Sequence, residues 1–185
     1  MEGGGEDPYL GSKIAVARIN GFQGNSLNDP LTIAACAKHF AAYGFAESGR
    51  DYNTVDIGEN TLYNIVLPPF KAATDAGVKT FMNSFNDLNG IPATADKHLQ
   101  RDILKGDWGF DGFISSDWVD GTYDGPASVS AGLNVEMPFQ IAYSYEALQE
   151  GIDQGLITEE DIDQLVYESL KTRLAYAVAE DKMEY

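Results

Sequence analysis

The sequence predicts an α/β fold with a parallel sheet of about four strands. Four short apolar segments suited to buried strands alternate with longer segments of helical periodicity. Strands that are joined by helices need right-handed crossovers, which place neighbouring strands parallel. A regular apolar stripe on the last helical segment indicates a helix that packs on this sheet.

The expected elements follow one another along the whole chain. Helices are predicted over 9–24, 59–76, 96–105, 126–131, 143–154 and 159–178, and strands over 32–40, 78–85, 112–116 and 133–138. Pro68 and Pro69 predict a break inside the second helix, because proline removes a backbone donor. Gly77 predicts the end of that helix.

The last helix has the clearest pattern. Thr158 is expected to cap it, ahead of an acidic first turn. Its apolar side chains recur every three or four residues and should face the sheet: Ile162, Leu165, Val166, Leu170 and Leu174.

The net charge of the chain limits the kinds of partner that it is expected to bind. The 185 residues contain 12 Lys and Arg against 29 Asp and Glu, which gives a net charge of -17. Such a charge argues against nucleic acid and against an anionic membrane, and favours a soluble protein with a neutral or cationic substrate. The length fits one domain over residues 1–185.

The sequence also disfavours a disulfide-stabilised protein, a membrane-spanning protein and a metal-binding protein. Cys36 is the single cysteine, so a disulfide framework is excluded and a small buried core residue is expected. No stretch reaches about 18 consecutive apolar residues, and the start of the chain does not read as a signal peptide. The glycine run at residues 3–5 is compatible with a tag or junction at 1–5. No metal-binding constellation is visible, and no cofactor is expected.

Polar clusters follow all four predicted strands. They are Lys38-His39, Asn83-Ser84-Phe85-Asn86, Ser116-Asp117-Trp118 and Glu136-Met137. In parallel α/β folds ligand chemistry gathers at this edge of the sheet. Asp117 beside an indole suits sugar chemistry, where a carboxylate attacks an anomeric centre and a ring packs on the pyranose. The alternatives are an Asp117 that caps a turn, a Lys38 that reaches solvent and a buried, hydrogen-bonded His39.

Seven ordered motifs carry a resemblance to a known family. They are Gly5-Glu6-Asp7-Pro8-Tyr9-Leu10, Lys38-His39-Phe40-Ala41-Ala42-Tyr43-Gly44, Gly49-Arg50-Asp51-Tyr52-Asn53, Leu67-Pro68-Pro69-Phe70, Met82-Asn83-Ser84-Phe85-Asn86-Asp87-Leu88-Asn89-Gly90, Trp108-Gly109-Phe110-Asp111-Gly112 and Ser116-Asp117-Trp118. From about residue 5 to about residue 180 the chain resembles glycoside hydrolase family 3, in its bacterial β-glucosidase branch.

The resemblance implies roles for individual residues. Asp117 matches the nucleophile that forms a covalent glycosyl-enzyme in a retaining mechanism, and Trp118 matches an aromatic residue that stacks on sugar. Lys38 and His39 match the pair that hydrogen-bonds glycone hydroxyls.

Four further positions complete the comparison with the family. Phe85 stands where many members have tyrosine, and Asn134 where many have aspartate. Phe85, Arg50 and Glu136 are counted as further candidate substrate contacts.

The resemblance also implies what lies elsewhere. Family members have a complete eight-stranded β/α barrel, and this chain matches its second half, so a half-barrel is expected. The general acid/base glutamate is expected in a following domain, with Glu47 as a weaker candidate inside the chain. The N-acetylhexosaminidase branch is disfavoured, because the segment from Lys38 to Gly44 lacks a second histidine.

Two functions remain open at this stage. The chain is either the nucleophile-bearing part of an enzyme that splits β-glucosides or β-xylosides, or a catalytically silent half-barrel with at most weak sugar binding. A half-barrel leaves two sheet edges and an apolar face uncovered, so self-association, a repacking of the helices or a missing half-barrel partner is expected. A periplasmic or secreted parent is compatible with this sequence.

Overall fold

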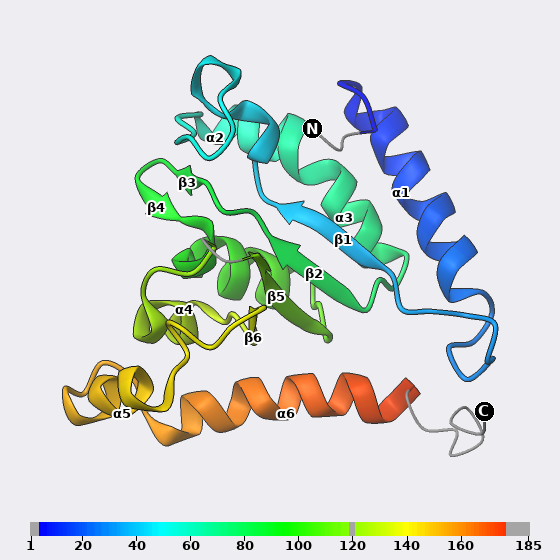
Figure 1. Ribbon diagram of the computed structural model, residues 1–185. Helices are drawn as coiled ribbons and strands as arrows, with labels where there is room; N and C mark the ends of the chain where they lie inside the picture. Colours follow the sequence, from blue (N-terminus) through cyan, green and yellow to red (C-terminus); the bar gives the residue numbers. More distant parts are fainter. Residues whose placement is uncertain (1–3, 119–120, 177–185) are drawn as a thin grey trace.

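The computed structural model describes residues 4–118 and 121–176 and has an α/β architecture (Figure 1). Its helices are α1 (Pro8–Gln23), η1 (Tyr43–Phe45), η2 (Glu47–Gly49), α2 (Glu59–Thr61), η3 (Leu62–Val66), α3 (Leu67–Asp75), η4 (Ala93–Ala95), η5 (His98–Asp107), α4 (Gly125–Ala131), α5 (Tyr145–Asp153) and α6 (Glu159–Tyr176). Its strands are β1 (Cys36–Phe40), β2 (Thr80–Asn83), β3 (Asp87–Leu88), β4 (Ile91–Pro92), β5 (Phe113–Trp118) and β6 (Val135–Met137).

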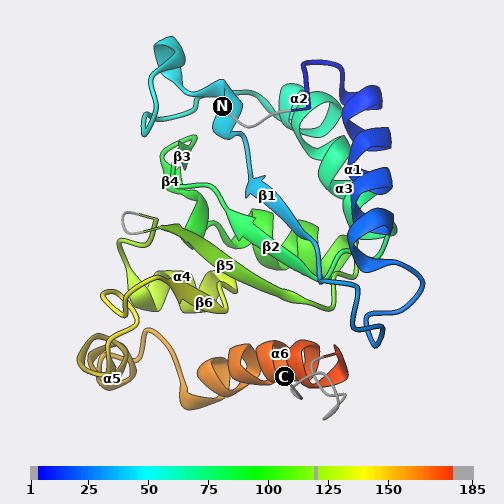
Figure 2. The ribbon, with the colours of Figure 1, turned by 45° about the vertical axis from the view of Figure 1, so that its right-hand side comes forward.

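The main sheet confirms the predicted fold class. It has four parallel strands in the order β1-β2-β5-β6, and each corresponds to one of the predicted strands. The helices α1 and α6 lie at opposite ends of this sheet, and α3 lies behind β1 and β2 (Figures 1 and 2). Because all four strands are parallel, their carboxyl ends lie at the same edge of the sheet.

Helices bury one face of the sheet more completely than the other. Phe81 and Ile114 are neighbours in register, and both side chains are fully buried on the helix-covered face. On the opposite face Cys36, Thr80 and Phe113 are aligned, and each retains solvent exposure. The sheet thus has the one-sided cover expected of half a barrel.

Aromatic rings fill the space between the sheet and its helices. Phe81 lies at the centre, with ring centroids 5.4 Å from Phe40 and 4.9 Å from Phe110 in edge-to-face arrangements. Phe40 also meets Phe70 of α3 at 5.2 Å. Such pairs stabilise a core beyond the area they bury, so β1 and β2 are firmly anchored to α3.

The predicted break at Pro68 and Pro69 is displaced. The chain continues as a helix through α2, η3 and α3, and a wide π turn at Leu62–Val66 comes just before the prolines. Both prolines lie in the first turn of α3, where a missing N–H is tolerated. The irregularity therefore lies in the turn before the prolines rather than at them.

The antiparallel pair β3–β4 was not predicted. Its turn is formed by Asn89 and Gly90, whose φ angles are 52° and 86°. An Asn-Gly pair with two positive φ angles is typical of a tight hairpin, so the signal was present in the sequence.

The prediction for α6 is correct in its cap and partly correct in its stripe, since Ile162 and Leu165 pack in a buried cluster while the rest of the stripe is exposed. Thr158 and Asp161 cap the helix reciprocally, with the Asp161 N–H donating to the Thr158 hydroxyl at 3.2 Å. Leu165 is buried, but 49% of Val166 and 64% of Leu174 are exposed. The buried side of α6 instead contains Leu165 and Thr172, with Glu168 between them.

A charged cluster explains this orientation of α6. Glu168 accepts a hydrogen bond of 2.5 Å from Lys105 and one of 3.2 Å from Arg101, both on η5. The Asn134 amide donates to Glu168 at 2.7 Å, and Asn134 Oδ1 accepts from Lys105 at 3.1 Å. An aspartate at position 134 would face Glu168 with a like charge, so asparagine suits this cluster.

Two further features concern exposure. Cys36 was expected in the core, but it is exposed because it lies on the uncovered face of an edge strand.

Within residues 4–118 and 121–176, every helix is too short or too polar to cross a bilayer.

The charged cluster predicts that Lys105 contributes more to the stability of the fold than a surface lysine does. We expect Lys105→Met to lower the free energy of unfolding by about 3 kcal/mol, because it leaves Glu168 without its main cation. Lys71→Met is the matched control: its pair with Asp75 is exposed, so a loss within about 0.5 kcal/mol is expected. Urea denaturation measures both variants, and equal losses would contradict the prediction.

The same cluster predicts a loss of stability in acid. Burial raises the pKa of Glu168, but Lys105 and hydrogen bonds outweigh it, so the pKa lies below its usual 4.5. The unfolded state then binds more protons, and the stabilisation present above pH 4.5 is lost as the pH falls through the folded-state pKa. Urea denaturation between pH 7 and 3 should show a steeper acid loss for the unmodified chain than for Glu168→Gln.

Candidate active site

The sheet brings two predicted site residues together at its carboxyl edge. His39 is the penultimate residue of β1 and Asp117 that of β5, and β2 lies between these strands. His39 Nε2 is 3.6 Å from Asp117 Oδ2. Only 8% of the His39 side chain and 13% of the Asp117 side chain are exposed, so a largely buried imidazole faces a largely buried carboxylate.

Asp117 is held by its own strand end. Its Oδ1 accepts a hydrogen bond of 2.7 Å from the Trp118 N–H, and its Oδ2 faces His39. The start of β5 is equally constrained, because a Cβ atom at Gly112 would lie 2.1 Å from the Lys79 carbonyl oxygen. Glycine is therefore needed where β5 enters the sheet, two residues before the strand core at Ile114.

The polar cluster after β2 has a structural part. The Asn83 amide donates to the Phe40 carbonyl at 3.2 Å, and the Ser84 hydroxyl donates to the Ala41 carbonyl at 2.8 Å. The Lys38–His39 and Phe40–Ala41 peptide bonds in the same segment are cis. Asn83 and Ser84 thus fix the backbone that carries His39.

Three predicted contacts have exposed side chains. Lys38 is exposed on β1, Trp118 is 56% exposed at the end of β5, and Arg50 is exposed just after η2. Glu47, the weaker acid candidate, is also exposed in η2. These side chains are accessible to a ligand in solution, whereas the side chains of Asp117 and His39 are more deeply buried.

Glu136 has a different environment from the other predicted contacts. It is buried, and its carboxylate accepts three backbone hydrogen bonds, from Ile141 at 3.0 Å, Ala142 at 3.0 Å and Tyr143 at 2.7 Å. This carboxylate anchors the loop between β6 and α5. Burial, together with the charge of Glu136, raises the pKa of the nearby Tyr143 hydroxyl.

Phe85 lies in an aromatic group to which the sequence analysis gave no role. Its ring is stacked on Tyr52 with centroids 4.2 Å apart, and it meets Tyr43 edge to face at 4.7 Å. Tyr43 in turn meets the His39 ring at 5.0 Å. Burial and the hydrogen bond to Asp51 raise the pKa of the Tyr43 hydroxyl, which therefore stays protonated. Both tyrosines lie inside quoted motifs, which was the only signal for them.

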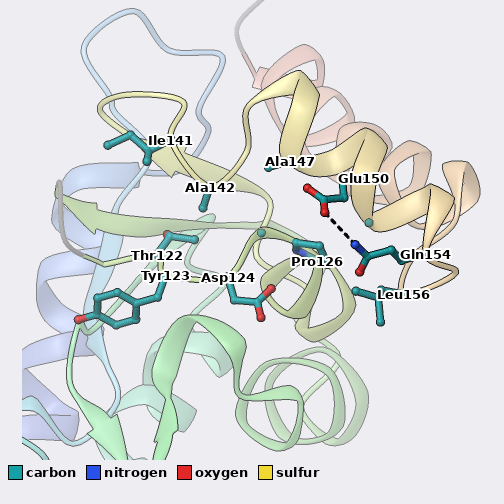
Figure 3. Close-up of a pocket in the computed structure, with 12 residues that line it drawn as sticks. Thr122, Tyr123, Asp124, Pro126, Ile141, Ala142, Ala147, Glu150, Gln154 and Leu156 are labelled. Carbon is teal, nitrogen blue, oxygen red and sulfur yellow. Dashed lines mark hydrogen bonds between the residues drawn. The ribbon is translucent and has the colours of Figure 1, made fainter.

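A hollow lies between the segment that follows β5 and helix α5. It has a volume of about 360 Å³ and is bounded by the loop before α4 and by α5. Figure 3 shows Tyr123 and Asp124 on one side and Glu150 and Gln154 on the other, with Gln154 donating to Glu150 at 2.8 Å. Asp124 also caps α4, which gives it a structural role.

A metal site is not evident in the part of the chain that the structure describes. Among residues 4–118 and 121–176, no three His, Cys, Asp or Glu side chains are grouped to hold an ion. His98 lies away from the strand ends on η5, half-exposed and 3.5 Å from Asp102.

The chain is similar to known proteins in sequence and in fold. A periplasmic β-glucosidase of Salmonella typhimurium is 38% identical over 172 residues, which are 88% of this chain and 22% of that protein. A β-xylosidase of Formosa agariphila is 36% identical over 88% of this chain and 22% of its own length. The crystal structure of a β-glucosidase from Listeria innocua in complex with isofagomine matches with a TM-score of 0.89 at 38% identity, covering 97% of this chain and 27% of that one. The chain thus spans about a fifth to a quarter of these relatives.

The match to a family model covers nearly all of the described chain. The model for the glycosyl hydrolase family 3 N terminal domain matches residues 1–171. This range includes the four strands of the sheet and the Asp117–His39 pair at its edge. The chain belongs to glycosyl hydrolase family 3.

Proposed function

We propose that this chain carries the nucleophile and part of the sugar site of a retaining β-glycosidase that acts on β-linked glucosides or oligosaccharides. The observation that carries this proposal is the largely buried Asp117 carboxylate facing His39 at the carboxyl edge of a parallel sheet. β-Glucosidases and β-xylosidases among the relatives support the same class of substrate.

In the proposed reaction Asp117 attacks the anomeric carbon. Its Oδ2 forms a bond to that carbon while the bond to the leaving oxygen breaks, and the leaving oxygen takes a proton from a general acid. Water then bonds to the anomeric carbon as the bond to Asp117 Oδ2 breaks, and its proton goes to the same group, which now acts as a base. The Trp118 N–H bonds to Oδ1, so it keeps the other oxygen directed toward His39 and the substrate.

We assign the glycone contacts to residues around Asp117. The Lys38 ammonium and the His39 imidazole would bond adjacent sugar hydroxyls, and the indole of Trp118 would pack on the ring. Arg50 is exposed and lies two residues before Tyr52, so we assign it to the outer part of the substrate site. We do not assign Glu136 to substrate, because three backbone N–H groups already occupy its carboxylate.

The proposed acid lies outside this chain. A retaining glycosidase needs two carboxyl groups about 5 to 5.5 Å apart, and Asp117 supplies one of them. The absence of a positioned acid typically costs about 10²- to 10⁴-fold in rate. The isolated chain is therefore expected to turn over little or no substrate, even though its nucleophile is in place.

Covalent labelling tests the role of Asp117. A mechanism-based 2-fluoro β-glucoside with a good leaving group needs little help from an acid, so we expect it to add one glycosyl group to Asp117. Peptide mass spectrometry locates the adduct, which should be absent in Asp117→Ala and retained in Asp75→Ala, a change at an exposed carboxylate. An adduct on another residue, or turnover of a nitrophenyl glucoside that survives Asp117→Ala, would contradict the assignment.

We further propose that a second half-barrel completes the site. Within the described residues β1 and β6 each pair with one strand, and the sheet face that contains Phe113 is open. When the chain is alone, a second copy is the available partner. Each copy has a net charge of -17, so added salt should favour the pairing by screening the repulsion.

Light scattering after size exclusion tests this pairing. We expect a dimer at micromolar concentration whose share rises between 20 and 300 mM salt. A well-folded monomer at every salt concentration would contradict self-association. A monomer that also fails to react with the 2-fluoro glycoside would favour the second candidate, a catalytically silent half-barrel, for which the open face and the two free edges are the supporting observations.

A further inference from the structure

We propose that Tyr52, backed by Phe85, forms a binding subsite for the aromatic aglycone of a β-glycoside. This inference rests on the proposed function, because the aglycone is the group that would leave when Asp117 attacks. It goes beyond that function by naming the chemical class of the leaving group and the residues that would select it.

The exposed Tyr52 ring is the first observation. Its plane is inclined by 13° to that of Phe85 at a centroid distance of 4.2 Å, so one ring face is covered. The residue is nevertheless 65% exposed, which leaves the other face open. A flat ring in solvent, supported from behind by a second ring, is a surface suited to a third flat group.

The loop that carries Tyr52 is built to hold it in place. A single carboxylate oxygen, Asp51 Oδ1, accepts from the Tyr43 hydroxyl at 2.5 Å and from the Tyr52 N–H at 3.2 Å. Tyr52 has a φ of 60°, and Ser48 in the same loop has a φ of 57°. Bulky residues seldom adopt this conformation, and such strain is found where the surrounding structure fixes a functional geometry.

A continuous series of contacts connects this ring to the nucleophile. Asp117 lies beside His39, the His39 ring meets Tyr43, and Tyr43 meets the Phe85 ring on which Tyr52 is stacked. Trp118 is also exposed at this edge. Phe85 itself is 8% exposed and lacks a hydroxyl, so the support behind Tyr52 is apolar.

Two polar side chains next to Tyr52, those of Asp51 and Asn53, are engaged within the loop, which favours an aromatic ligand over a second sugar. Asp51 Oδ1 is already bonded to Tyr43 and Tyr52, the Asn53 amide donates to the Glu47 carbonyl at 3.3 Å, and Asn53 Oδ1 accepts from the Thr54 N–H at 2.9 Å. A sugar ring needs hydrogen bonds around its rim, whereas an aryl ring needs only a flat apolar face.

Binding by the intact 185-residue chain tests the subsite without requiring turnover. Chemical shifts in NMR titrations give the dissociation constants of phenyl β-glucoside, methyl β-glucoside and cellobiose. We expect phenyl β-glucoside to bind about threefold to tenfold more tightly than methyl β-glucoside. This ratio should fall to about one in Tyr52→Ala and in Tyr52→Leu, persist in Tyr52→Phe, and persist in Tyr167→Ala, which changes an equally exposed ring on α6.

The outcomes separate this proposal from the proposed function. An unmodified chain without a preference for the phenyl glucoside, or a preference that survives Tyr52→Ala and Tyr52→Leu, would overturn the subsite even if the 2-fluoro glycoside labels Asp117. A Tyr52-dependent preference for cellobiose alone would overturn its aromatic class. A Tyr52-dependent phenyl preference without labelling would support the subsite and refute the nucleophile.

Discussion

Buried hydrogen bonds between the ends of β1 and β2 are the constraint on which the site depends. The amide of Asn83 and the hydroxyl of Ser84 are fully buried and bond the carbonyl groups of Phe40 and Ala41. The Ser84 N–H adds a further bond of 2.8 Å to Phe40. Because an unpaired buried carbonyl is costly, the segment that carries His39 has one favourable position against β2. That position puts the imidazole beside Asp117.

The polar groups at the strand ends therefore divide into two kinds. The carboxylate of Glu136 and the hydroxyl of Ser116 bond the chain itself, the latter accepting from the Met137 N–H at 2.9 Å. Asp117 keeps an oxygen that meets His39 at 3.6 Å, which is longer than a hydrogen bond. Glu136 and Ser116 thus fix the chain around the strand ends, whereas Asp117 is the group that we propose acts on a ligand.

The sequence predicted those features that depend on local pattern. Four apolar segments ending in polar residues were enough to predict the sheet and to bring His39 and Asp117 to one edge. The orientation of α6 could not be predicted in this way, because a buried ion pair at Glu168 outweighs its apolar stripe. The Tyr52–Phe85 stack joins a loop to a strand end 33 positions later in the sequence. A periodic pattern of apolar residues cannot predict a contact between two such distant positions.

The open face of the sheet links folding to the completion of the site. Small polar side chains such as Thr80 and Ser115 alternate there with Met82 and Phe113, so an uncovered face costs less than a wholly apolar one. Met82 and Phe113 remain the groups that a second half-barrel would bury. They lie on β2 and β5, and Asp117 is the penultimate residue of β5. A partner that covers this face must also build a wall beside Asp117, so docking and completion of the site would be one event.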